Sequence, residues 1–139
     1  MATAKRSGAA ALPMRPGEKP WTEAELDKVR SELLAEIEEL RTNIGQAESE
    51  IAERLGDAVG GAGDDQADAG AKTFQREYDL SLTQNARELL DFTQSALARI
   101  DDGSYGVCAS CGEPIGKARL KAFPRATLCV TCKQREERR

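Results

Sequence analysis

Two long stretches of the chain carry apolar residues at the spacing of packed helices. In the first, steps of four and three alternate, which is the 3.5-residue repeat of a coiled-coil seam. Thr22 and Glu25 form a capping-box pattern at its start, and Trp21 can pack on Leu26 as a hydrophobic staple. We therefore expect a helix from Thr22 to about Leu55. Its seam comprises Leu33, Ile37, Leu40, Ile44, Ala47 and Ile51.

The second stretch runs from about Lys72 to Ile100 and again has helical spacing. Gly103 follows Asp102 and predicts a helix end there, because glycine readily adopts the left-handed conformation just past a helix. Two helices of similar length with one connection favour an antiparallel hairpin within residues 21–102, although a compact bundle or a homodimeric coiled coil would also cover both seams. The oligomeric state stays open. The second seam comprises Phe74, Tyr78, Leu82, Leu89, Phe92 or Thr93, Ala96 and Ile100.

The connection at about residues 56–71 is rich in glycine and aspartate and has no basic residue before Lys72. Glycine disfavours helix continuation, so this segment is the predicted tip of the hairpin. Its carboxylates form a concentrated negative charge. A plain solvated linker and a surface that meets a basic site or a metal-containing centre in a partner both fit this composition.

Residues 1–20 show no hydrophobic period and contain three prolines, which predicts a disordered N-terminal tail. Aromatic residues make up only 4% of the chain and charged residues 32%, so a large globular core is not expected. The predicted fold class is mainly α: a long antiparallel coiled-coil hairpin, a small C-terminal module at residues 103–139, and this tail.

All four cysteines lie in the C-terminal module, as Cys108-x-x-Cys111 and Cys129-x-x-Cys132. This spacing is typical of a tetrahedral zinc site. Four thiolates leave no open coordination position, and the chain has no histidine, so we expect one structural Zn²⁺. Two disulfides or a redox pair are the alternatives. They are less favoured because the N-terminal apolar run is too short for a signal peptide.

The same considerations indicate the reducing cytoplasm. No apolar run approaches the roughly 20 residues of a membrane helix, so we also expect a soluble protein. From Lys117 onward, basic residues outnumber acidic ones. That segment could dock on an acidic protein surface or contact nucleic-acid phosphates, or it could simply be a solvated basic tail. The sequence pI near 5.0 argues against a general DNA-binding role for the whole chain.

The ordered set of motifs resembles the DksA/TraR family. The resemblance rests on a helical hairpin with Asp65-x-x-Asp68 near its tip, followed by Tyr105-Gly106-x-Cys108-x-x-Cys111-Gly112 and Leu128-Cys129-x-x-Cys132. It implies a bacterial transcription regulator that binds RNA polymerase. Such proteins insert the coiled-coil tip into the secondary channel and modulate initiation without recognising a specific DNA sequence.

The resemblance also implies roles for individual residues. Asp65 and Asp68 match the paired tip aspartates of the family, which act near the polymerase catalytic centre. The family usually has alanine where this chain has Gly70, which suggests a looser tip and a weaker contact. In members that respond to guanosine tetraphosphate, basic residues occupy positions that match Phe92 and Phe123. Only Lys133 keeps the charge, so we expect a weak or absent response to this nucleotide.

A second hypothesis is a zinc-ribbon nucleic-acid-binding module that dimerises through its helices. Its phosphate contacts would come from Lys117, Arg119, Lys121, Arg125 and Lys133. These residues could equally dock the zinc module on a protein. An enzyme is not expected, because the chain has no histidine, nucleophile elbow or phosphate-binding loop.

Overall fold

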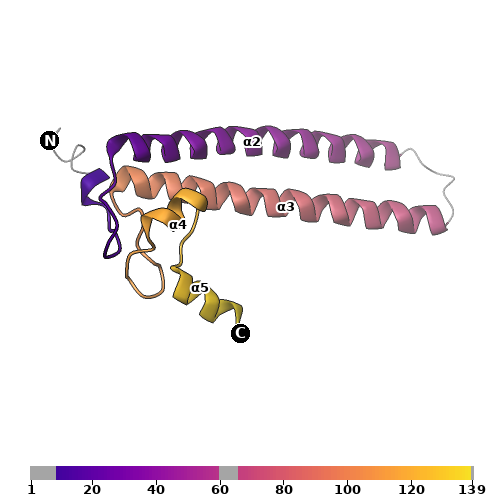
Figure 1. Ribbon diagram of the computed structural model, residues 1–139. Helices are drawn as coiled ribbons and strands as arrows, with labels where there is room; N and C mark the ends of the chain where they lie inside the picture. Colours follow the sequence, from indigo (N-terminus) through magenta and orange to yellow (C-terminus); the bar gives the residue numbers. More distant parts are fainter. Residues whose placement is uncertain (1–8, 60–65, 139) are drawn as a thin grey trace. The chain divides into compact units, whose positions relative to one another are not determined.

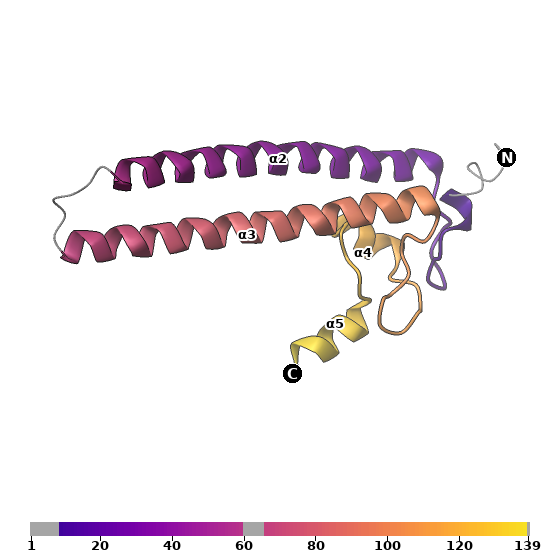
Figure 2. The ribbon, with the colours of Figure 1, turned by 180° about the vertical axis from the view of Figure 1, so that it is seen from behind.

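The computed structural model describes residues 9–59 and 66–138, which include two long helices and two short ones. The long helices α2 (Glu23–Val59) and α3 (Gln66–Asp102) run in opposite directions (Figure 1, Figure 2). The short helices are α4 (Lys117–Ala122) and α5 (Val130–Glu137). This confirms the predicted fold class, a mainly helical chain with an antiparallel hairpin and a small C-terminal module.

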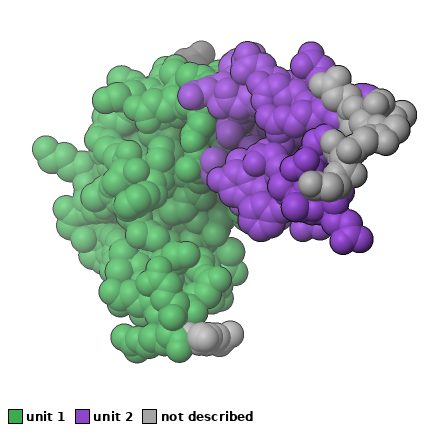
Figure 3. Space-filling view, turned by 90° about the vertical axis from the view of Figure 1, so that its right-hand side faces the viewer, with its two compact units in different colours: residues 1–36, 92–139 green, residues 37–91 purple. Residues whose placement is uncertain are grey.

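The chain divides into two compact units (Figure 3). Unit 1 holds residues 1–36 and 92–139, and unit 2 holds residues 37–91. Each unit therefore contains part of both long helices. None of the described helices is both long enough and apolar enough to span a membrane.

The predicted start of the first helix is confirmed in atomic detail. The Thr22 backbone N–H donates to Glu25 Oε1 at 3.0 Å, and the Glu25 N–H donates to Thr22 Oγ1 at 3.1 Å. This is a reciprocal capping box, which satisfies two N–H groups that have no partner within the helix. Trp21 is buried, and Leu26 packs against the same apolar core.

The helix ends nearest the tip differ from the prediction. Helix α2 continues to Val59 instead of ending near Leu55, and α3 begins at Gln66 instead of near Lys72. Glycine costs only about 1 kcal/mol relative to alanine in a helix, so isolated glycines do not end it. At the start of α3, alanines favour the helix and Asp68 lies in its first turn, where a negative charge is stabilised by the helix dipole. Both helices thus extend into the segment predicted as the tip at 56–71, and residues 60–65 between them lie outside the described residues.

The apolar core of unit 1 joins the base of both long helices to the cysteine module. Leu33 of α2, Ala96 of α3 and Leu120 of α4 each have 0% exposure. Gly103 ends α3 with a φ of 83°, the left-handed conformation that the sequence predicts there. The buried core comprises Ala9, Leu12, Trp21, Val29, Leu33, Ala96, Ile100, Tyr105, Cys108, Ile115, Leu120, Cys129 and Cys132.

The N-terminal segment also differs from the prediction. Residues 1–8 lie outside the described residues, but residues 9–20 are part of unit 1 instead of a disordered tail. Ala9 and Leu12 are buried in its core. The Glu18 carboxylate accepts backbone N–H groups from Lys117 at 3.0 Å and Ala118 at 3.2 Å. Ala9, Leu12 and Glu18 thus connect this segment to unit 1, although they create no sequence period.

In unit 2, the predicted α2 seam is largely confirmed: Ile37, Leu40, Ile44 and Ile51 are buried. The predicted α3 seam, however, is wrong in the first half of that helix. Phe74, Tyr78 and Leu82 are 71%, 54% and 51% exposed, whereas Thr83 is buried.

The helical repeat explains this register. Seven-residue steps back from the buried Ile100 reach Thr93, Ala86 and Asp79, which is the repeat of a coiled-coil seam. Phe74, Tyr78 and Leu82 follow steps of four, which move across the helix surface by about 40° per step. Asp79 pairs with Arg54 of α2, which is consistent with this side of α3 facing the partner helix.

Candidate metal centre and acidic tip

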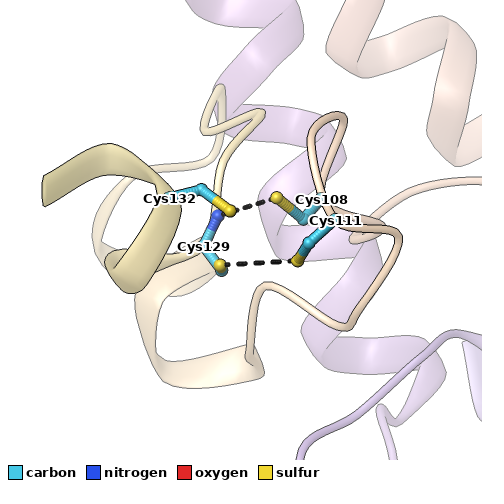
Figure 4. A group of neighbouring side chains, drawn as sticks. All are labelled: Cys108, Cys111, Cys129 and Cys132. Carbon is cyan, nitrogen blue, oxygen red and sulfur yellow. Dashed lines mark hydrogen bonds between the residues drawn. The ribbon is translucent and has the colours of Figure 1, made fainter. Parts of the chain in front are cut away.

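Four cysteine sulfurs converge at the centre of the C-terminal module. Cys108 and Cys111 lie in the loop after α3, Cys129 caps α5, and Cys132 lies within α5 (Figure 4). All four Sγ atoms lie within 4.8 Å of one another, and none is in a disulfide. Cys111 Sγ is 3.8 Å from Cys129 Sγ. A tetrahedron with metal–sulfur bonds of about 2.3 Å has an edge of about 3.8 Å, so this donor set fits Zn²⁺.

Backbone hydrogen bonds shape the first cysteine loop. The Gly112 N–H donates to the Cys108 carbonyl at 3.0 Å, which closes the turn, and Gly112 has a φ of 77° that favours glycine. The Cys108 N–H donates to the Glu113 carbonyl at 2.9 Å. The Cys129 N–H then donates to Cys108 Sγ at 3.4 Å, which brings the second cysteine pair against the first. These hydrogen bonds hold the loop in a shape that directs the sulfurs of both cysteine pairs toward one point.

The electrostatics of the site favour a cation. Burial by itself raises the pKa of Cys108, but backbone N–H groups of Cys111, Cys129 and Ser110 outweigh it and hold this pKa at about 6. The side chain of Cys129 is the main cause that raises the pKa of Cys132 to about 12. The Cys108 thiolate is thus stabilised, whereas Cys132 resists ionisation. A divalent cation would allow all four sulfurs to ionise together, because it supplies the opposing charge.

A buried tyrosine connects the metal module to the helix base. Tyr105 is 1% exposed, and its hydroxyl donates to the Pro124 carbonyl at 2.8 Å. Burial raises the pKa of Tyr105, so it remains a neutral hydrogen-bond donor. Its ring centroid lies 6.1 Å from that of Trp21, and the Lys117 ammonium lies 5.8 Å from the centroid of the Trp21 ring. The zinc module and the helix base therefore share one core.

The basic side chains proposed for docking or phosphate contacts are mostly engaged within the chain. Lys121 pairs with Glu25, and Arg125 pairs with Glu36. Arg119 Nε donates to the Leu128 carbonyl at 3.1 Å, and its guanidinium lies 5.6 Å from the centroid of the Phe123 ring. These intramolecular contacts do not favour the nucleic-acid-binding hypothesis.

Lys133 lines a hollow of about 330 Å³ in unit 1. Phe92, Arg119 and Arg125 line the same hollow, and both Phe92 and Phe123 are exposed. Phe92 and Lys133 therefore line the same hollow. Whether these positions take part in nucleotide binding stays a prediction from the resemblance.

The sequence patterns did not identify Glu18 and Glu25 as residues that bind the C-terminal module. Glu25 was recognised only as a capping residue, yet it also pairs with Lys117 at 2.6 Å. The side chains of Lys117 and Lys121 and the Thr22 N–H lower the pKa of Glu25 to about 2. The two lysines lie more than 90 residues away in sequence, so no local pattern could have identified them. Glu18, within the predicted tail, had no signal at all.

The predicted tip residues are only partly within the described chain. Asp65 lies outside the described residues. Asp68 lies in the first turn of α3 and is exposed. The roles of both residues therefore remain predictions from the family motif.

Comparison with known families identifies the C-terminal module. Residues 103–138 match the model of the prokaryotic dksA/traR C4-type zinc finger. A segment of 75 residues is 44% identical to the RNA polymerase-binding transcription factor DksA of Caulobacter vibrioides. That match covers 54% of this chain and 53% of the relative, so it spans about half of each protein.

Longer matches include both helices. Over 119 residues the chain is 29% identical to the RNA polymerase-binding transcription factor DksA of Escherichia coli strain K12, which covers 86% of this chain and 76% of the relative. The solved structure of transcription factor DksA2 from Pseudomonas aeruginosa superposes with a TM-score of 0.68 at 36% sequence identity. It covers 84% of this chain and 85% of DksA2. This chain belongs to the DksA/TraR family of C4-type zinc finger proteins.

Proposed function

We propose that this protein is a transcription regulator that binds bacterial RNA polymerase in the cytoplasm. In this proposal the acidic hairpin tip enters the secondary channel and modulates initiation. The observation that carries the proposal is the similarity to DksA2, at 36% identity over 84% of this chain. That similarity extends well beyond the zinc finger to the helices, and the relatives described above are named as transcription factors.

The two long helices suit such a role. Each has 37 residues and would be about 55 Å long at 1.5 Å per residue. Asp65, just before α3, and Asp68, in its first turn, stand at the family spacing. We infer that these carboxylates act near the catalytic centre of the polymerase, and that the protein has no catalytic activity of its own.

We assign one structural Zn²⁺ to Cys108, Cys111, Cys129 and Cys132. Its support is the sulfur geometry together with the family match. The metal would hold the loop after α3 and helix α5 together, and the polymerase would be contacted by the surface that this arrangement presents. Sequence-specific DNA binding is not part of the proposal, because Lys121 and Arg125 are paired within the chain.

We further propose that guanosine tetraphosphate has little effect through the hollow that contains Phe92 and Lys133. Phosphate binding requires charge-assisted donors, and a phenyl ring cannot provide one. Arg125 lines the hollow but already pairs with Glu36. Adding the nucleotide should therefore change the regulatory effect by less than about twofold, as measured by transcription from a responsive promoter.

The function is tested with purified polymerase and the zinc-loaded chain. Co-elution with core polymerase measures binding, and the lifetime of promoter complexes measures the effect on initiation. The Asp65→Asn/Asp68→Asn double variant should keep its helicity and its zinc but lose the effect on promoter complexes.

The matched control is Asp57→Asn/Asp64→Asn. It removes the same charge from the predicted tip segment, residues 56–71, but leaves the Asp-x-x-Asp motif intact. Full activity of the Asp65/Asp68 variant would refute the tip assignment. Absence of any polymerase binding by the wild-type chain would refute the proposed function as a whole.

A further inference from the structure

Residues 9–20, which we call the N-terminal strap, hold the start of helix α4. The contact is made by Glu18, whose carboxylate accepts three backbone N–H groups. The Arg15 N–H donates to Oε1 at 2.9 Å and so orients the carboxylate within the strap. The N–H groups of Lys117 and Ala118 donate to Oε1 at 3.0 Å and to Oε2 at 3.2 Å. These are the first two residues of α4, where backbone N–H groups have no acceptor within the helix.

Helix α4 has no cap of its own. Its N-cap residue is Gly116, which has no side chain, and its first turn contains no acidic residue. Helices usually satisfy their first N–H groups with a side-chain oxygen of the N-cap residue. The strap passes close to this point, because a Cβ atom on Gly116 would lie 2.9 Å from Arg15 Cδ. Glu18 therefore caps α4 from 99 residues before Lys117 in the sequence.

The Glu18 carboxylate is charged in this position. Burial by itself raises the pKa of Glu18, but the backbone N–H groups of Arg15, Lys117 and Ala118 outweigh it and hold this pKa below its usual value. Hydrogen bonds to a charged acceptor are stronger than those between neutral groups. The cap therefore stabilises the start of α4 more than a neutral side chain would.

Helix α4 in turn contacts the chain beside both cysteine pairs. Leu120 has 0% exposure and packs at Gly106, two residues before the first pair, where a Cβ atom on the glycine would lie 3.2 Å from Leu120 Cδ1. Arg119 Nε donates at 3.1 Å to the carbonyl of Leu128, the residue directly before the second pair. Local opening of α4 would therefore loosen the sulfur cluster at two points.

We infer that the N-terminal strap controls how long the module keeps its metal: by capping α4 through Glu18, it slows zinc release. Ala9 and Leu12, buried in the core, hold the strap in place. Opening of a small part of a protein is an equilibrium, and every contact that makes opening rarer also makes escape of a bound metal slower. The inference rests on the structural Zn²⁺ proposed above, but it does not depend on polymerase binding.

The test combines two measurements on the full zinc-loaded chain. One is the rate of zinc release into an excess of the chromogenic chelator pyridylazoresorcinol, and the other is hydrogen exchange of the Lys117 and Ala118 amides. Glu18→Ala removes the cap and should accelerate both on the order of three- to tenfold, the usual effect of losing an N-cap. Glu18→Gln keeps the size of the side chain but not its charge, so it should accelerate both by a smaller factor.

Glu23→Gln is the matched control for Glu18→Gln. Glu23 is the same residue type and loses the same charge, but it is exposed in the first turn of α2. Zinc release and exchange at the two α4 amides should change by less than about twofold in this variant. All variants should begin with one zinc per chain, because the four cysteines are untouched. The initial zinc content thus tests the metal assignment separately from the strap.

Two results would overturn the role of the strap. Unchanged zinc release from Glu18→Ala, with or without faster amide exchange, would show that the strap does not govern the metal. Equal acceleration by Glu18→Gln and Glu23→Gln would show a general effect of charge instead of a cap. A wild-type chain that binds no zinc would refute the metal assignment, and the inference with it.

Discussion

Units 1 and 2 share the same two long helices but bury them very differently. Unit 1 encloses side chains with 0% exposure from α2, α3 and α4. In unit 2, the most buried apolar side chains come from α2 and range from 4% to 9% exposed, and α3 contributes the polar Thr83. One end of the hairpin is thus part of a layered core, while the other is a two-helix seam with apolar side chains mainly on one side.

This difference shows that one pair of helices can be deeply buried in one unit and only partly buried in the other. Hydrophobic burial scales with apolar area removed from water, so most of the free energy of unfolding should reside in unit 1. Unit 2 relies partly on ion pairs, Arg54 with Asp79 and Arg87 with Glu48. At least one partner of each pair is about half exposed, and such pairs contribute little, so unit 2 should open at lower free energy than unit 1.

The largest expected effect is loss of the metal. Cys111→Ser should leave three thiolates, lose zinc and unfold residues from about 106 to 133, because structural zinc supplies roughly 10–16 kcal/mol of apparent binding energy in small zinc modules. Zinc stoichiometry and the emission of Trp21, the chain's single tryptophan, measure this loss. Trp21 is 2% exposed, so its emission should shift to the red.

Ala109→Ser is the control for this loss, because it adds a hydroxyl beside the site and leaves all four sulfurs in place. It should keep its zinc. A Cys111→Ser chain with one zinc per molecule and unchanged Trp21 emission would contradict the assignment of a structural metal.

A smaller effect comes from removing a side chain from the unit 1 core. Leu33→Ala should lower the free energy of unfolding by about 2–5 kcal/mol, because Leu33 has 0% exposure and its truncation leaves a cavity. Its neighbour Leu34 is 46% exposed, so Leu34→Ala should cost less than about 0.5 kcal/mol. Urea unfolding of both variants provides the comparison, and similar losses would show that the core has been placed on the wrong face.

The seam of unit 2 can be strengthened by a single substitution. Thr83→Val should raise the stability of unit 2 by about 1 kcal/mol, because a buried hydroxyl is replaced by a methyl group beside Ile51. The Thr83 hydroxyl donates to the Asp79 carbonyl one turn earlier, a contact that does little for a helix. Hydrogen exchange of α3 amides measures local opening, which should become rarer. Faster exchange would show that the Thr83 hydroxyl is itself stabilising.

The smallest expected effect concerns an ion pair. Arg87→Gln should cost less than about 1 kcal/mol, because Arg87 and Glu48 are both about half exposed. The loss should shrink further at 1 M salt, where charges are screened over about 3 Å. Urea unfolding at low and high salt checks this. A loss above 2 kcal/mol that is insensitive to salt would mean that unit 2 depends on this pair far more than its exposure suggests.

Local patterns accounted for much of the molecule. The Cys-x-x-Cys spacing brought together four sulfurs whose geometry fits zinc, and the Thr22–Glu25 pattern identified a capping box with both hydrogen bonds. Gly103 correctly marked the end of α3. These signals succeed because each depends on residues within a few positions of one another.

Periodicity identified both helices but chose the wrong distal face of α3. That helix carries two competing stripes, and the apolar one, Phe74, Tyr78 and Leu82, is the more conspicuous in sequence. Hydrophobicity alone favoured it. The observed face continues the seven-residue repeat from Ile100 and pairs Asp79 with Arg54 across the seam.

By itself the sequence determined the two helices, the start of the first, the end of the second and the four sulfur ligands, because these follow from short-range geometry. Only the tertiary structure decided that residues 9–20 join the core, that Glu18 and Glu25 bind the far end of the chain, and that the α3 stripe is exposed. The physical reason is that burial and ion pairing depend on the partner surface, which is assembled from residues far apart in sequence.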